Sequence, residues 1–253
     1  MRYFVCEQSI VRKIWGRSEL VLFIFAGASA EFALNKAVDW LYFTGRLPAD
    51  PLGRLFSTVA YAQRIIYLPH DEATAAIDSI ASIHQDVENK RQSSIPQSSY
   101  RDVLYMLIDY TIKVHDQFER KLTWIEKEEV FDVFYRMGVR MKIEGLPGTY
   151  SEWAVDRGAH LIADLERSSF TNDLYQRYRE SLGNVRYWVL IQVQKILCPN
   201  RVRELLRFKI NILTPVLLKS YQIIRFLRMD GLIRLIFLPS AYKEQIKGLN
   251  RSK

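Results

Sequence analysis

His84 stands at a position where an imidazole could do chemistry. It shares an apolar stripe at helical spacing with Ile77, Ile80 and Val87. An imidazole on an apolar face must find a partner for its ring nitrogens, because burying an unpaired polar group costs free energy. Two interpretations of His84 therefore stay open: a hydrogen-bonded core histidine, or a ligand of a metal or haem iron.

A second pair of polar residues lies upstream of His84. Arg54 and Thr58 are four residues apart, so a helix places the guanidinium and the hydroxyl on one face, one turn apart. Tyr61 and Ile65 continue that face. Such a pair can bind a carboxylate, a haem propionate or dioxygen, and the arginine suits charge stabilisation because it keeps its proton. The alternative is an ordinary ion pair between Arg54 and a neighbouring acidic residue.

The remaining motifs exclude most enzyme classes that have local signatures. The other histidines (His70, His115 and His160) form no His-Glu-x-x-His pair and no cluster with cysteine, so a conventional zinc site is not predicted. The chain has no Gly-x-Ser-x-Gly elbow and no Gly-x-Gly-x-x-Gly fingerprint. His115, on a stripe with Leu104 and Ile108, is the next candidate for a ligand.

Helical periodicity predicts the elements that must position these residues. Asp50-Pro51 is an N-cap followed by a first-turn proline, and Thr123-Trp-Ile-Glu126 has the capping-box pattern. The expected helices cover about 51–68, 71–89, 99–121, 123–142, 150–166, 171–181, 185–197, 201–212 and 214–238. No alternating strand pattern is found. The sequence therefore predicts an all-α fold, organised as a single domain over residues 1–253.

The apolar run from Leu20 to Ala30 has the Ala-x-Ala ending of a signal peptide. However, Glu19 adjoins the run, and the run is about half of the ~20 residues that span a bilayer. The run therefore predicts a buried helix.

The net charge of +8 belongs to the C-terminal end of the chain. Residues 201–253 contain 12 basic residues against three acidic ones, whereas residues 1–200 contain 24 and 25. This distribution, with no recognition module, argues against a nucleic-acid partner. The basic C-terminal helices are amphipathic, so they could close the core or contact a membrane surface peripherally. The two cysteines, Cys6 and Cys198, form no disulfide framework and favour a reducing, cytoplasmic location.

Several motifs together resemble one known family. They comprise Arg54-x-x-x-Thr58, His84-x-x-Val87, Tyr100-Arg-Asp-Val-Leu, Leu122-Thr123-x-x-Glu126-x-Glu128, Gly145-Leu-Pro147-x-Thr149-Tyr150, Leu197-Cys-Pro199-x-x-Val-Arg203 and Leu238-Pro239. Their order and spacing over roughly residues 20–245 resemble the rubber oxygenase catalytic domain family. This family includes the latex-clearing proteins and the endoplasmic-reticulum oxygenase of mycophenolic acid biosynthesis.

The resemblance implies a globin-like all-α domain that holds haem b, with His84 as the proximal iron ligand. Arg54 and Thr58 would lie near the haem and supply hydrogen bonds to dioxygen or its reduced forms. The expected activity is oxidative cleavage of a carbon–carbon double bond in an apolar, isoprenoid-like molecule. Glu31 is the candidate for the glutamate that the family carries upstream of the arginine. The alternative is a non-catalytic module on the same fold that binds a lipid or a partner.

Overall fold

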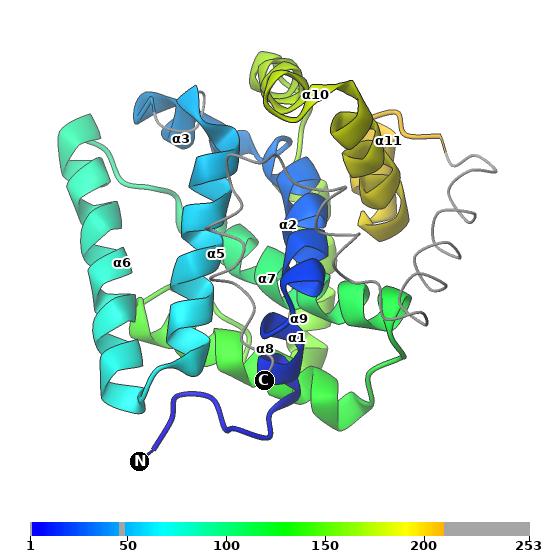
Figure 1. The fold of residues 1–253 in the computed structure, drawn as a ribbon. Helices are drawn as coiled ribbons and strands as arrows, with labels where there is room; N and C mark the ends of the chain where they lie inside the picture. Colours follow the sequence, from blue (N-terminus) through cyan, green and yellow to red (C-terminus); the bar gives the residue numbers. More distant parts are fainter. Residues whose placement is uncertain (1, 46–48, 210–253) are drawn as a thin grey trace.

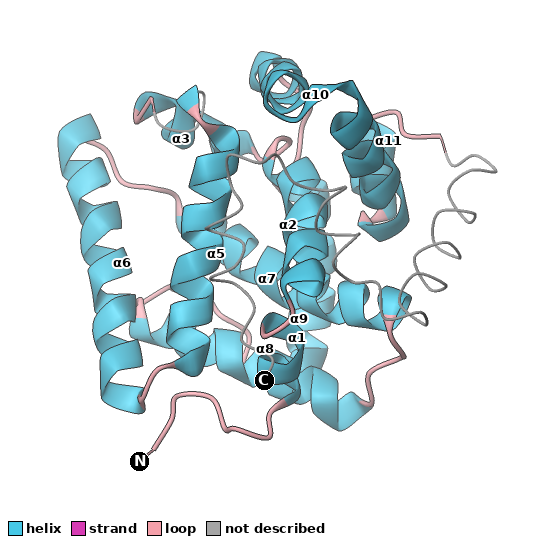
Figure 2. Cartoon of the chain, viewed as in Figure 1, coloured by secondary structure: helices cyan, strands magenta, loops and turns pink. Residues whose placement is uncertain are grey.

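The computed structural model describes residues 2–45 and 49–209, and helices make up most of both segments (Figures 1 and 2). The elements are α1 (Ile10–Trp15), α2 (Ser18–Phe32), η1 (Lys36–Val38), α3 (Asp39–Phe43), α5 (Pro51–Tyr67), α6 (His70–Arg91), α7 (Gln97–Phe118), α8 (Trp124–Arg140), α9 (Tyr150–Ala163), α10 (Ser169–Leu197) and α11 (Asn200–Leu205). Only two isolated backbone bridges of the β type occur in these segments. The predicted all-α fold is confirmed.

Helix α2 forms the centre of the molecule. Its apolar residues have no polar face to offer to solvent, and Val21, Phe23 and Ile24 are almost completely buried. A helix that is apolar all round needs neighbours on every side. In Figure 1, α7 runs behind α2, α5 lies on one side of it, and α10 and α11 lie on the other. The run from Leu20 to Ala30 is thus a buried helix, as its sequence predicts.

Helices α5 and α6 form a hairpin at one side of the molecule (Figure 1). The Asp50 side chain accepts the backbone N–H of Gly53 at 2.8 Å, and Pro51 opens α5 as predicted. Pro69 separates the two helices, and a proline there leaves α6 without an N-cap side chain. This hairpin carries Arg54, Thr58 and His84.

The helices that follow agree with the sequence signals in most respects. The capping box of Thr123 and Glu126 is present, and Thr149 forms another with Glu152. The two helices predicted over 171–181 and 185–197 are both present within α10, and Gly183 interrupts the helical backbone between them with a φ of 72° and a ψ of 168°. The helix predicted over 150–166 ends earlier, at Ala163.

The C-terminal prediction needs a correction in its described part. The helix predicted over 201–212 ends at Leu205 as α11, because Arg207 turns left-handed (φ 57°). The backbone N–H of Phe208 then donates to the Arg203 carbonyl at 2.8 Å, which closes the helix end. The helix predicted over 214–238 lies outside the described residues, so the single-domain organisation of the whole chain remains a prediction.

Among the helices of segments 2–45 and 49–209, none is both long and apolar enough to cross a bilayer.

Candidate active site

The stripe that carries His84 faces the interior of the α5–α6 hairpin. Ile77 is fully buried, and Ile80, His84 and Val87 are half-buried. The Nδ1 atom of His84 is shielded from water and has no hydrogen-bond partner within the described part of the chain. Burial, followed by the nearby charge of Arg54, lowers the pKa of His84, so its imidazole is neutral at physiological pH. A neutral imidazole with an unpartnered nitrogen is the form that binds a metal ion.

Arg54 and Thr58 lie on α5, across the hairpin from His84. Both side chains are half-buried, and Arg54 is close enough to influence the charge state of His84. The hydroxyls of Ser57 and Thr58 donate to the Arg54 carbonyl, at 2.7 and 3.1 Å. The arginine of one helix therefore lies within electrostatic range of the histidine of the other.

Tyr61 and Ile65 follow Arg54 and Thr58 at helical spacing on α5. Ile65 is fully buried in the core, whereas Tyr61 is exposed, so this side of α5 is mixed in character.

His115, the second candidate ligand, has a different environment. It is buried on α7, and its Nδ1 lies 2.9 Å from the Arg120 carbonyl. That contact requires a proton on Nδ1 and provides the hydrogen bond that a core histidine needs. His115 thus fits the structural interpretation better than His84 does.

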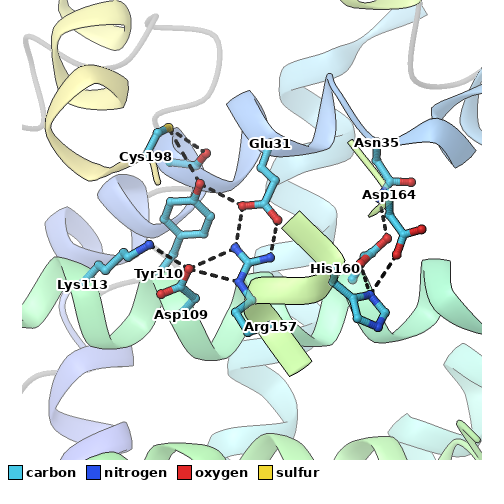
Figure 3. Close-up of polar contacts among 11 residues, drawn as sticks. Glu31, Asn35, Asp109, Tyr110, Lys113, Arg157, His160, Asp164 and Cys198 are labelled. Carbon is cyan, nitrogen blue, oxygen red and sulfur yellow. Dashed lines mark hydrogen bonds and ion pairs between the residues drawn. The ribbon is translucent and has the colours of Figure 1, made fainter. Parts of the chain in front are cut away.

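Glu31, the candidate for the catalytic glutamate, is held in a buried ion pair. Both of its carboxylate oxygens accept hydrogen bonds from Arg157, at 2.6 Å each, and the side chain is almost fully buried (Figure 3). The Tyr110 hydroxyl donates a third hydrogen bond to it at 3.1 Å. A carboxylate in this state is a structural ion-pair partner, so the suggested catalytic role of Glu31 is not supported by its contacts.

The same ion pair continues into a larger network (Figure 3). Arg157 also contacts Asp109 at 3.0 Å, and Lys113 contacts Asp109 at 2.8 Å. Burial alone would raise the pKa of Asp109, but Lys113 and Arg157 outweigh that effect and lower it. The network thus links α2, α7 and α9 through charges that all have partners.

A second polar cluster surrounds His160 on α9. Its Nδ1 lies 2.6 Å from Asp102 and 3.0 Å from Asp164, and Asn35 donates to the other oxygen of Asp102 at 2.7 Å (Figure 3). The hydrogen bond with Asp102 raises the pKa of His160. One ligand atom from each of Asp102, His160 and Asp164 falls within 4.8 Å of the others, a spacing that a metal ion could use. The raised pKa favours the protonated form of His160, whose positive charge balances these carboxylates.

Neither network was predicted from the sequence. The spacing of Asp156, His160 and Asp164 at four-residue intervals places carboxylates on either side of the histidine along α9, and this signal was present. Asp102, Asp109 and Glu31 come from other helices, and no sequence pattern connects them to α9.

The cysteines are both free thiols. Cys6 is exposed, whereas Cys198 is buried next to the Tyr110 hydroxyl at 3.7 Å. Burial raises the pKa of Cys198 to about 12, so this thiol stays protonated and unreactive.

The residues at the α5–α6 hairpin fit the haem group that the family resemblance implies. The buried and unpartnered Nδ1 shows that the protein leaves the His84 imidazole unsatisfied, which costs free energy unless a ligand compensates. The neighbouring Arg54 adds a fixed positive charge. A neutral imidazole beside a guanidinium can bind iron and stabilise negative charge that develops nearby.

A comparison with family models identifies the family of the chain. Residues 13–228 match the family described as "ER-bound oxygenase mpaB/B'/Rubber oxygenase, catalytic domain". Searches among curated proteins and among solved structures give no match. Because the family match covers most of the sequence, the chain belongs to the mpaB/rubber oxygenase catalytic-domain family, a family of oxygenases.

Proposed function

We propose that the protein is a haem b-dependent oxygenase that uses dioxygen to cleave a carbon–carbon double bond in an apolar, isoprenoid-like substrate. The observation that carries the proposal is the His84 imidazole, which is neutral and has a buried nitrogen without a partner among the described residues. The oxygenase family of the chain supports the reaction class.

His84 is the residue that would hold the iron. Its helix, α6, packs against α5 and contains buried apolar residues such as Ala73 and Ile77, so the backbone that carries the imidazole is held rigidly. The lowered pKa keeps the ring unprotonated at neutral pH, as a metal ligand must be. When bound, haem b would supply the redox chemistry that activates dioxygen.

Arg54 and Thr58 would interact with dioxygen and its reduced forms. The Arg54 guanidinium offers a permanent positive charge and several N–H donors to the negative charge that develops on dioxygen. The Thr58 hydroxyl donates to the Arg54 carbonyl and retains lone pairs that can accept a hydrogen bond. In this proposal Arg54 stabilises charge and Thr58 orients the reactants.

The location of the protein is proposed as cytoplasmic, with peripheral membrane contact through the basic C-terminal segment. Support comes from the free thiols of Cys6 and Cys198 and from the excess of basic residues after residue 200. An apolar substrate would be concentrated at a membrane surface, which is consistent with such contact.

The test is the replacement His84→Ala in the full chain. We expect the purified variant to lose the Soret band while its circular dichroism spectrum keeps the helical signal, because a half-buried side chain is removed without breaking a hydrogen bond. His115→Ala is the matched control and should retain haem. A Soret band of normal intensity in His84→Ala would show that another residue holds the iron. A wild-type protein that binds no haem would favour a non-catalytic module that binds a lipid or a partner.

A further inference from the structure

A metal-binding histidine works best when the plane of its ring is fixed before the metal binds. The proposed function leaves the Nδ1 of His84 for iron, since this atom is shielded from water and has no partner in the described segments. The plane of the ring must therefore be fixed by contacts of the ring itself.

The contact that remains is aromatic. Tyr100, in the first turn of α7, packs against the His84 ring with the centroids 5.3 Å apart and the planes tilted by 52°. Tilted aromatic contacts at this separation are favourable. Tyr100 thus restricts the imidazole from the side of α7.

Glu88 holds Tyr100 in this position by a hydrogen bond. It lies one turn after His84 on α6, and its Oε1 accepts the backbone N–H of Ile95 at 2.7 Å and the Tyr100 hydroxyl at 3.3 Å. The chain turns at Gln92, whose φ of 53° is left-handed, and the N–H of Ser93 donates to the Glu88 carbonyl. The linker between α6 and α7 is therefore folded back onto the helix that carries His84.

We propose that Tyr100 is a positioning residue for His84 and that Glu88 is its anchor. The Tyr100 ring holds the plane of the imidazole by packing, so that the ring is preorganised to bind iron. This inference rests on the proposed function of His84 as the iron ligand. It assigns a role to the α6–α7 linker, which otherwise only connects two helices.

The test uses the full chain with the variants Tyr100→Leu, Tyr100→Phe and Glu88→Ala. Tyr100→Leu removes the ring, Tyr100→Phe removes only the hydroxyl, and Glu88→Ala removes the anchor without touching the ring. Tyr150→Leu is the matched control, because Tyr150 is also a half-buried tyrosine in aromatic contacts but lies on α9. His84→Ala identifies the His84 signals in the NMR spectrum.

The first measurement is the NMR spectrum of the His84 ring protons in the haem-free protein. We expect Tyr100→Leu to abolish the ring-current shift of these protons and Glu88→Ala to reduce it. Tyr100→Phe loses only the hydroxyl bond to Glu88 and should reduce it less than Glu88→Ala, which also loses the bond to the Ile95 N–H. Tyr150→Leu should leave it close to that of the wild type. Unchanged His84 signals in both Tyr100→Leu and Glu88→Ala would overturn the proposal.

The second measurement is the affinity of the haem-free protein for hemin, together with the electron paramagnetic resonance spectrum of the ferric form. Loss of a residue that orients a metal ligand typically weakens binding about 10–100-fold, and we expect this range for Tyr100→Leu. The resonance should also broaden, because the imidazole plane is no longer fixed. Wild-type affinity and line shape in Tyr100→Leu would contradict the positioning role.

The two proposals fail in different ways. If the wild type binds no hemin, or if His84→Ala binds it equally well, the proposed iron ligand is wrong. The NMR comparison in the haem-free protein still decides whether Tyr100 fixes the His84 ring.

Discussion

The α5–α6 hairpin and the interior formed by α2, α7 and α9 differ in whether their polar side chains have hydrogen-bond or ion-pair partners. In the interior, Arg157 is almost fully buried and contacts two carboxylates, and each of those carboxylates has further partners. In the hairpin, His84 is only half-buried, yet its Nδ1 has no partner among the described residues. A protein satisfies the polar groups that hold its fold, because an unsatisfied one costs free energy. The unsatisfied imidazole therefore points to binding, and the satisfied arginine to stability.

The largest effect is expected for Arg157→Met, which tests whether the buried ion pairs of the interior stabilise the fold. The variant leaves Glu31 and Asp109 buried without their cation, and breaking a buried ion pair typically costs about 3–5 kcal/mol. We expect the free energy of unfolding, measured by urea denaturation, to fall by that amount. Replacing Glu31 and Asp109 by leucine in the same variant should recover much of the loss. A decrease below about 1 kcal/mol would mean that the network does not support the fold.

Arg54→Ala tests the functional side of the comparison. Removing one donor that stabilises developing charge typically costs a factor of about 100–1,000 in rate, or about 2.7–4 kcal/mol of barrier. We expect turnover of an unsaturated apolar substrate to fall by such a factor while haem binding stays near normal. The exposed Arg64 of the same helix provides the control, Arg64→Ala. Loss of haem in Arg54→Ala would instead indicate that Arg54 binds a haem propionate or forms a structural ion pair. Turnover equal to that of the wild type would exclude a role of Arg54 in stabilising charge on dioxygen.

The histidines of the two regions should respond to pH with opposite signs. The hydrogen bond with Asp102, together with the charges of Asp156 and Asp164, raises the pKa of His160 above its ordinary 6.5. Its contribution to stability is thus fully present below pH 6.5 and is lost as the pH rises through the folded-state pKa. For His84 the pKa is lowered, so folding instead loses stability as the pH falls below 6.5.

The measurement for this contrast is urea denaturation of the wild type and His160→Gln between pH 6 and pH 9. We expect the stability difference between them to be largest at pH 6 and to shrink as the pH rises. A difference that stays constant over this range would show that His160 is not protonated in the folded protein.

The smallest effect is expected for Arg140→Met. Arg140 forms a bidentate pair with Asp78 between α8 and α6, but both side chains are about half exposed. Water and salt screen such a pair, so its removal should cause no resolvable change in the urea midpoint. This variant is also the control for Arg157→Met, because it removes an arginine that bridges helices at the surface. A loss as large as that of Arg157→Met would contradict the distinction between buried and exposed pairs.

Local signals predicted most of the helices but not all of their ends. The Asp50-Pro51 start of α5 and the capping box at Thr123 depend on residues within one turn, so sequence alone reveals them. The end of α11 at Leu205 depends on a left-handed Arg207, which no glycine or proline signals. Helix ends of this kind are set by the surrounding packing.

For the candidate site, the sequence determined which residues share a helix face, and the tertiary structure decided what surrounds them. The spacing within α5 and within α6 is enough to suggest Arg54 with Thr58, and His84 on its apolar stripe. The approach of Arg54 to His84, the ring contact of Tyr100 and the pairing of Glu31 with Arg157 each join different helices. Helical periodicity is a local property of the backbone, whereas the desolvation and pairing of a charge depend on residues up to 126 positions away.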